Sequence, residues 1–306
     1  MRIEKIVVGI DFSRPGIDAV KWVAEHFAPN AELILVHVVG PPRTPAFLHG
    51  LVPADEEVVA WETGEAESRL REIARPLTAA RVRTIVRNGR PHEELATIAA
   101  ETGADLVAVG PHGDNPHPWK MLGTTAERVA RAAVPAVLVV TSPGNAPPRR
   151  VLVAVDDSPI TPTVLDWAKA VADALGSDVT ALHVLRDAAM RHAPTPGSTA
   201  ANEAERVARV STEMLNAANR WLAALADAGL GRERVDSIVA HGKPGDVVLE
   251  TARGIGADLI VLGRRGRGRL IPAVVGSTVS TVLHGTHAPV LVVTEEEHDW
   301  TEPAEG

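Results

Sequence analysis

The same series of motifs occurs twice in this chain of 306 residues, in the same order. IVVGIDFS at Ile6–Ser13 corresponds to VLVAVDDS at Val151–Ser158, and GADLVAVG at Gly103–Gly110 corresponds to GADLIVLG at Gly256–Gly263. A period of about half the chain is far too long for a solenoid or a propeller blade. The repeat therefore predicts two domains of similar fold, which agrees with the domain number that the length alone favours.

Composition marks the junction between the two copies. The stretch TSPGNAPPRR at Thr141–Arg150 holds three prolines and one glycine, which is typical of an extended linker. The second copy carries seven extra residues between Val184 and Pro244, which we expect a surface helix and its loop to absorb. The expected organisation is a first domain at 1–141, a linker at 142–149, a second domain at 150–294 and an acidic tail at 295–306.

Each copy alternates short runs of Val, Ile and Leu with longer amphipathic stretches. The short runs are mostly continuous rather than alternating, as expected for strands buried on both faces of a parallel sheet. Five such runs and four helical stretches per copy predict an α/β fold of two tandem, doubly wound, five-stranded parallel-sheet domains. Ligands of such sheets bind outside the carboxyl ends of the strands, so candidate site residues are sought there.

Serines and prolines indicate where helices begin. Ser13 and Ser158 follow the first strand of each copy, and each has a proline one or two positions later. A serine N-cap with proline in the first turn is a common helix start, so we expect both serines to be N-caps. Pro91 and Pro244 are expected to begin the third helix of each copy in a similar way.

A glycine pattern follows the fourth strand of each copy, with the spacing Gly-x2-Gly-x9-Gly and two hydroxyl residues after the last glycine. Glycine lets the backbone approach a ligand closely, and a helix that begins at Ser or Thr offers free N–H groups to an anion. The pattern predicts a phosphate cradle in each half; the alternative is that the glycines serve only turns. The residues are Gly110, Gly113, Gly123, Thr124 and Thr125, and Gly263, Gly266, Gly276, Ser277 and Thr278.

Together with the aspartate after strand one and the His-Val pair in strand two, this pattern resembles the universal stress protein family, once per half. The resemblance implies an ATP-binding fold in which the glycine motif holds phosphates and ribose. It also implies that Asp11 and Asp156, and the backbone of Val38 and Val184, hold the adenosine end. Mg²⁺ is expected only because it accompanies ATP.

The family also implies how domains assemble and what the protein does. The fifth strands, at Ala136–Val140 and Val290–Val293, are expected to pair with each other, and a homodimer through edge strands is expected beyond that. The implied role is that of an ATP-binding stress-response regulator, which acts through nucleotide-dependent conformation and an unknown protein partner. A slow ATPase of the same fold, or an interaction scaffold with one or no working site, stays open as an alternative.

The two glycine loops differ in charge. The second contains Arg264, Arg265, Arg267 and Arg269, which suit a polyphosphate, whereas the first is rich in proline and carries Lys120 as its one basic residue besides two histidines. The first site is therefore predicted to bind ATP more weakly than the second. His112, Asp114 and His117 form a weaker candidate for a metal site, because their spacing is irregular.

Charge and composition limit the other possibilities. The formal net charge of −8 argues against a general binder of nucleic acid or of anionic membranes. The absence of Cys excludes disulfides and thiolate sites but is neutral between compartments. A cytoplasmic protein is expected because the apolar run at the N-terminus is short and broken by charge, unlike a secretion signal, and no apolar stretch approaches the length of a membrane span. Trp22 and Trp167 lie at matching places on amphipathic stretches and are expected in the core. The segments Pro41–Asp55 and Arg186–Ala200 are predicted to be either lids or partner surfaces.

Overall fold

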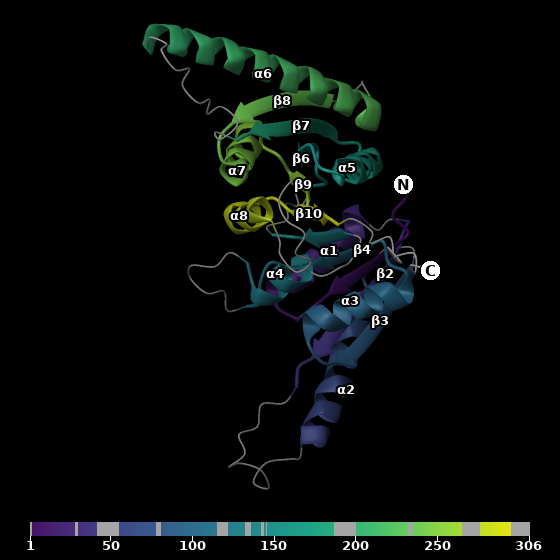
Figure 1. Ribbon diagram of the computed structural model, residues 1–306. Helices are drawn as coiled ribbons and strands as arrows, with labels where there is room; N and C mark the ends of the chain where they lie inside the picture. The colour runs from purple at the N-terminus through teal and green to yellow at the C-terminus, as the bar shows by residue number, and fades with distance from the viewer. Residues whose placement is uncertain are drawn as a thin grey trace, which may run out of the picture.

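The computed structural model describes residues 2–27, 30–41, 55–77, 81–114, 122–131, 136–141, 144, 146–186, 200–231, 235–264 and 276–294 (Figure 1). The strands and helices of the first half are β1 (Lys5–Gly9), α1 (Arg14–His26), β2 (Glu32–Val39), α2 (Asp55–Ala74), β3 (Arg81–Asn88), α3 (Pro91–Thr102), β4 (Leu106–Val109), α4 (Thr124–Arg131) and β5 (Ala136–Val139). Those of the second half are β6 (Arg150–Val155), α5 (Thr161–Leu175), β7 (Asp178–Leu185), α6 (Ala200–Leu230), β8 (Val235–His241), α7 (Pro244–Ile255), β9 (Leu259–Gly263), α8 (Ser277–Gly285) and β10 (Val290–Val293).

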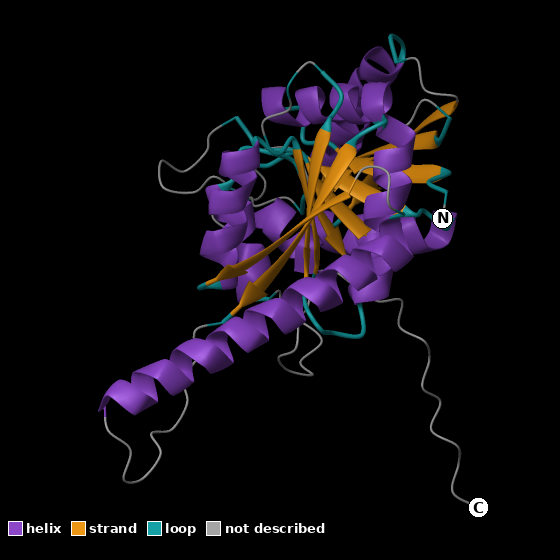
Figure 2. Cartoon of the chain, turned by 90° about the horizontal axis from the view of Figure 1, so that it is seen from above, coloured by secondary structure: helices purple, strands orange, loops and turns teal. Residues whose placement is uncertain are grey.

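All the strands in the described residues belong to one sheet, in the order β3-β2-β1-β4-β5-β10-β9-β6-β7-β8. The strands are parallel within each half, as expected. The two halves join where β5 and β10 pair antiparallel, with Val139 opposite Val290 and Ala136 opposite Val293. This confirms the pairing of the fifth strands and leaves β3 and β8 as the edges. Figure 2 shows the strong twist of the sheet between its helical layers.

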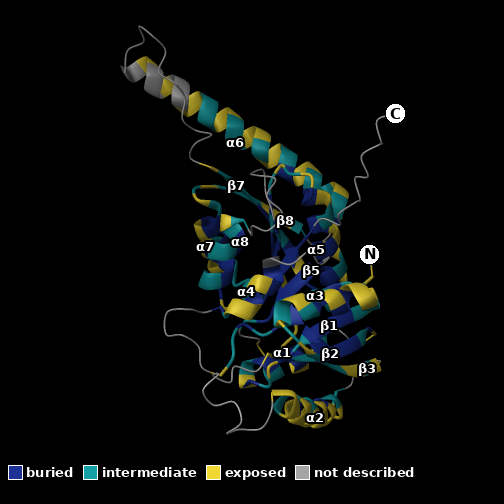
Figure 3. Ribbon diagram, turned by 60° about the horizontal axis from the view of Figure 1, so that its bottom comes forward, coloured by how far each residue is buried: buried dark blue, intermediate teal, exposed yellow. Residues whose placement is uncertain are grey.

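Helices cover both faces of the sheet, which explains the continuous apolar strands. One face packs against α1, α2, α5 and α6, and the other against α3, α4, α7 and α8. The strands between them contribute side chains to both cores, and Figure 3 shows the central strands as the most buried part of the molecule. Trp22 and Trp167 are 4% and 2% exposed, which confirms both as core residues.

The repeated Gly-Ala-Asp-Leu motif has a structural role at the amino ends of the strands. Asp105 Oδ2 accepts hydrogen bonds from the backbone N–H groups of Glu4 (2.8 Å) and Lys5 (2.9 Å). Asp258 Oδ2 does the same for Arg149 (3.0 Å) and Arg150 (3.1 Å). In each half the aspartate before the fourth strand therefore holds the start of the first strand in place through two hydrogen bonds.

The helix starts agree with the sequence in three of four cases. Ser13 caps α1, because its hydroxyl accepts from Gly16 N, and Pro91 and Pro244 are the first residues of α3 and α7. The prediction for Ser158 is wrong: α5 begins at Thr161, where a second proline follows, and Thr161 N donates to Ser158 O in a preceding turn.

The extra residues of the second half lie in a longer helix. Helix α6 has 31 residues, whereas its counterpart α2 has 20, and Figure 1 shows α6 running past the sheet. Most of the two segments predicted to be lids or partner surfaces lies outside the described residues. No helix in the described part of the chain has both the length and the apolar character needed to cross a membrane.

Candidate functional site

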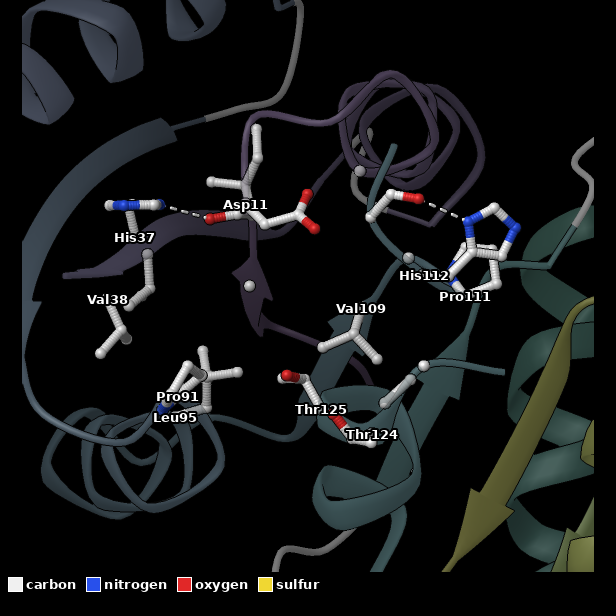
Figure 4. A pocket seen from close by; sticks show the side chains of 18 residues that line it. Asp11, His37, Val38, Pro91, Leu95, Val109, Pro111, His112, Thr124 and Thr125 are labelled. Atoms are coloured by element: carbon white, nitrogen blue, oxygen red, sulfur yellow. Dashed lines mark hydrogen bonds between the residues drawn. The ribbon is translucent and has the colours of Figure 1, made fainter. Parts of the chain in front are cut away.

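A cavity of about 200 Å³ lies at the carboxyl ends of β1, β2 and β4, beside the starts of α1, α3 and α4 (Figure 4). It is where ligands of doubly wound sheets bind. The structure brings together here all the residues predicted for the first site: Asp11, Val38, Gly110, Gly113, Gly123, Thr124 and Thr125.

Asp11 is oriented by the turn that follows β1. Its Oδ1 accepts from Ser13 N (3.0 Å) and from Ser13 Oγ, both in the cap of α1. Its Oδ2 lies 3.1 Å from the point where a Cβ on Gly113 would stand, so this oxygen faces the glycine loop. Figure 4 shows the carboxylate across the cavity from Thr124 and Thr125. The arrangement leaves Asp11 able to accept a further hydrogen bond from a ligand.

The glycine loop closes tightly on the first strand and helix. A Cβ on Gly110 would stand 3.1 Å from the Cα of Gly16, and a Cβ on Gly123 would stand 3.2 Å from the Cα of His112. Gly123 N donates to Pro111 O at 2.6 Å, and α4 begins at the next residue. Close packing against backbone atoms therefore favours glycine at positions 110 and 123, independently of any ligand. The same packing places the N-terminus of α4 at the cavity, where its free N–H groups favour an anion.

An aromatic stack lies next to Asp11, with His37 lining the cavity, and sequence reasoning missed it. Phe12 has a φ of 61° and stacks on His37 with ring centroids 4.3 Å apart, while the Arg69 guanidinium carbon lies 4.2 Å from the Phe12 centroid. His37 Nδ1 lies 2.8 Å from Ile10 O. A carbonyl only accepts, so Nδ1 carries the proton. Burial lowers the pKa of His37, against smaller opposing effects of that hydrogen bond and of Asp11.

The first glycine loop is tied to α1 through Asp114. Asp114 Oδ1 accepts from Arg14 N at 2.8 Å, so its carboxylate caps the helix. His112 Nδ1 lies 2.8 Å from Gly113 O. His117, the third residue of the candidate metal site, lies outside the described residues. Across the described ranges, no three His, Asp or Glu side chains are grouped as metal ligands would be.

The second half has a matching cavity of about 100 Å³, bounded by strands β6, β7 and β9. Of the residues predicted for this site, Asp156, Val184, Gly263 and Thr278 line it. Ser277 lines a groove next to it, and Gly276 N donates to Arg264 O at 3.1 Å. Four loop residues of the predicted site lie outside the described part of the chain: Arg265, Gly266, Arg267 and Arg269.

The surroundings of the second cavity differ from those of the first. His183 Nδ1 lies 3.0 Å from Val155 O, which repeats the contact made by His37. The ring packed on His183 is Trp221 of α6, edge-on at 4.9 Å, whereas Asp157 stands at the position of Phe12. Thr161 Oγ1 donates to the backbone carbonyl of Asp156. The same histidine is thus kept in both halves with different neighbours.

Comparison with known proteins agrees with this arrangement. The model of the universal stress protein family matches residues 2–141 and again residues 148–294. A universal stress protein of Mycolicibacterium smegmatis is 28% identical over 297 residues, covering 94% of this chain and 96% of its own. The Mycobacterium tuberculosis universal stress protein Rv2623 is 28% identical over 313 residues, covering 95% and 96%.

Among solved structures, a universal stress protein from Archaeoglobus fulgidus matches with a TM-score of 0.66 at 20% identity, covering 97% of this chain and 98% of its own. At that identity the match shows the shared fold. The family model covers nearly the whole chain in two successive copies. The chain belongs to the universal stress protein family, with one domain of that family in each half.

Proposed function

We propose that each half of the chain binds one adenine nucleotide, with ATP as the principal ligand, and that a protein partner responds to the occupied state. The observation that carries this proposal is the first cavity, which gathers every residue predicted for that site from three separate parts of the sequence. A ligand changes a conformational equilibrium only through different affinity for the two states, so the partner must bind the occupied form better or worse than the empty one.

The residues of the cavity suit such a ligand. Asp11 is an acceptor for an amino or hydroxyl group, and the Val38 backbone lies at the end of β2 on the same wall. Thr124 and Thr125 lie at the start of α4, where hydroxyl and N–H donors meet the positive end of the helix dipole. Mg²⁺ would be held chiefly by the phosphates of the nucleotide.

The direct test is to extract the purified protein with acid and to quantify released nucleotide per chain, followed by titration with ATP. Binding at two sites is expected, with weaker binding at the first. Gly123→Glu and Gly276→Glu place a negative side chain at the two phosphate ends, and the second change should remove more bound ATP. Gly64→Glu is the control, since Gly64 is exposed on α2 and nothing lies within 4 Å of its Cβ position.

Three results would change this proposal. Equal loss of ATP from both glycine variants would contradict the predicted difference between the sites. No bound nucleotide and no binding in the titration would favour an interaction scaffold. Steady release of inorganic phosphate above background, lost in the Gly276→Glu variant, would favour the slow ATPase.

The homodimer stays a prediction, and the strand order limits which strands could pair between two chains. Because β5 and β10 pair within one chain, an edge-strand dimer would have to use β3 or β8. Strand β3 carries Arg81, Arg83 and Arg87, and charged edge strands usually oppose strand addition. Sedimentation equilibrium checks this: the mass of one chain at all concentrations would contradict the dimer.

A further inference from the structure

A groove of about 340 Å³ opens from the second cavity and shares Arg186, Pro244 and Thr278 with it. Strand ends form one side, and the starts of α7 and α8 form the other. Its other lining residues are Gly242, Lys243, Gly245, Asp246, Ser277 and Thr281. A ligand in the second cavity could therefore extend into this groove without crossing a strand or helix.

Two cationic side chains, Arg186 and Lys243, line the groove because neighbouring strands end there. Gly242 N donates to Leu185 O at 3.0 Å, which places the next residues, Arg186 and Lys243, at adjacent strand ends. In the part of the chain that the structure describes, neither makes an ion pair within 4 Å. Asp246 is the carboxylate that lines the same groove. Adjacent like charges repel, so an anion bound between them would be stabilised.

The first half lacks this feature at the matching place. Gly89 N donates to Val39 O at 3.0 Å, in the same way, so Gly40 corresponds to Arg186 and Arg90 to Lys243. Gly40 has no side chain, and Arg90 is already paired with Glu93 at 3.1 Å. The pair of cations is therefore specific to the second half.

Three hydroxyl side chains line the groove together with the cations. Ser277, Thr278 and Thr281 all lie on α8 and line it. The helices α7 and α8 are packed closely there, since a Cβ on Gly245 would stand 2.6 Å from the Cβ of Thr281. Cations and hydroxyl donors that line one groove form the kind of site that binds phosphate oxygens.

The position of the groove indicates which part of a nucleotide reaches it. Arg186 follows Val184 by two residues, at the end of the site expected to hold adenosine, whereas Ser277 and Thr278 belong with Gly263 and Gly276 to the cradle expected to hold the 5′-phosphates and ribose. The groove adjoins both parts, which is where the ribose of a bound nucleotide would lie. We infer that the second site takes an adenine nucleotide with an additional phosphate on its ribose, bound between Arg186 and Lys243. This inference rests on the proposed nucleotide binding of the second half.

The experiment compares adenosine 3′,5′-bisphosphate and adenosine 2′,5′-bisphosphate with AMP by calorimetric titration of the full chain. One charge-assisted phosphate contact corresponds to roughly a tenfold change in affinity. We expect one of the bisphosphates to bind about tenfold more tightly than AMP, at one site per chain. Arg186→Gly, which introduces the residue of the first half, should bring the ratio of the two affinities close to one, and Lys243→Gln should lower it.

Arg90→Gln is the matched control, because it changes the corresponding cation of the first half and should leave the ratio at its wild-type value. Equal affinity for AMP and both bisphosphates would overturn the inference while leaving the proposed function standing. A preference that survives Arg186→Gly, or one lost in Arg90→Gln, would also overturn it. No binding of any adenine nucleotide, ATP included, would overturn the proposed function together with this inference. Circular dichroism melting curves check that the variants are folded.

Discussion

Replacing Phe12 by glycine should cost less stability than replacing it by alanine, which reverses the usual order of these residues. Phe12 is the one non-glycine residue among those described whose φ is positive, at 61°. A residue with a Cβ in that conformation is strained by about 1–2 kcal/mol. The strain is offset by the stack on His37, about 0.5–1.5 kcal/mol, and by the Arg69 contact, about 0.5–1 kcal/mol.

Both substitutions remove the ring and lose its contacts, but only glycine also removes the strain. Glycine itself lowers the free energy of unfolding by about 0.4–1 kcal/mol relative to alanine, because it gives the unfolded chain more conformational freedom. The Phe12→Gly variant should therefore be more stable than Phe12→Ala by about 0.5–1 kcal/mol. Urea denaturation followed by circular dichroism measures the difference in the free energy of unfolding.

The second half provides the control for this prediction. Asp157 stands at the position of Phe12 in the repeat, and its φ is not positive. There, Asp157→Gly should be less stable than Asp157→Ala by about 0.4–1 kcal/mol, the ordinary order. If alanine were the more stable residue at both positions, the reasoning from backbone strain at Phe12 would be refuted.

Three further changes test other parts of the structure. Trp22→Ala should lower the free energy of unfolding by about 3–5 kcal/mol, since it empties a buried site; a urea titration showing a loss under about 1 kcal/mol would contradict the core assignment. Asp105→Ala leaves two backbone N–H groups without their acceptor and should cost about 2 kcal/mol in the same assay, whereas an unchanged midpoint would show that the aspartate is dispensable. Burial lowers the pKa of His37 below its usual 6.5, so its stabilising contribution is complete above that pH and declines as the pH falls below it. His37→Asn keeps an N–H donor for Ile10 O and should lessen the decline in stability measured from about pH 8 to about pH 5; an identical decline would refute this role.

The fold and most of the first site were predictable because the informative residues lie at the ends of strands. A repeat of continuous apolar runs defines parallel strands, and the carboxyl ends of such strands meet at one edge of the sheet. Asp11, Val38 and Gly110 could thus be placed together although they are far apart in the chain. Pairing of the fifth strands was expected from the family resemblance, and it is confirmed.

What the sequence did not show depends on a choice between nearby helix starts or on contacts between distant residues. Ser158 was predicted to cap a helix, but Pro159 and Pro162 both allow a helix to begin nearby, and the fold uses the later one. Asp114 resembled a metal ligand, yet its neighbour in space is the backbone of Arg14, 100 positions away. The strain at Phe12 likewise depends on side chains from β2 and α2.

The antiparallel join of β5 and β10 determines how the two sites relate to each other. Because strand direction reverses there, the carboxyl ends of the strands in the first half and those in the second half lie at opposite ends of the sheet, measured along the strands. A protein that bound at one candidate site would therefore leave the other candidate site accessible from the far side. Since the join lies within one polypeptide, dilution does not separate the halves, and every molecule carries one site of each kind. Such a pair is free to diverge in ligand, because the β5–β10 join never requires either half to pair with an identical copy of itself.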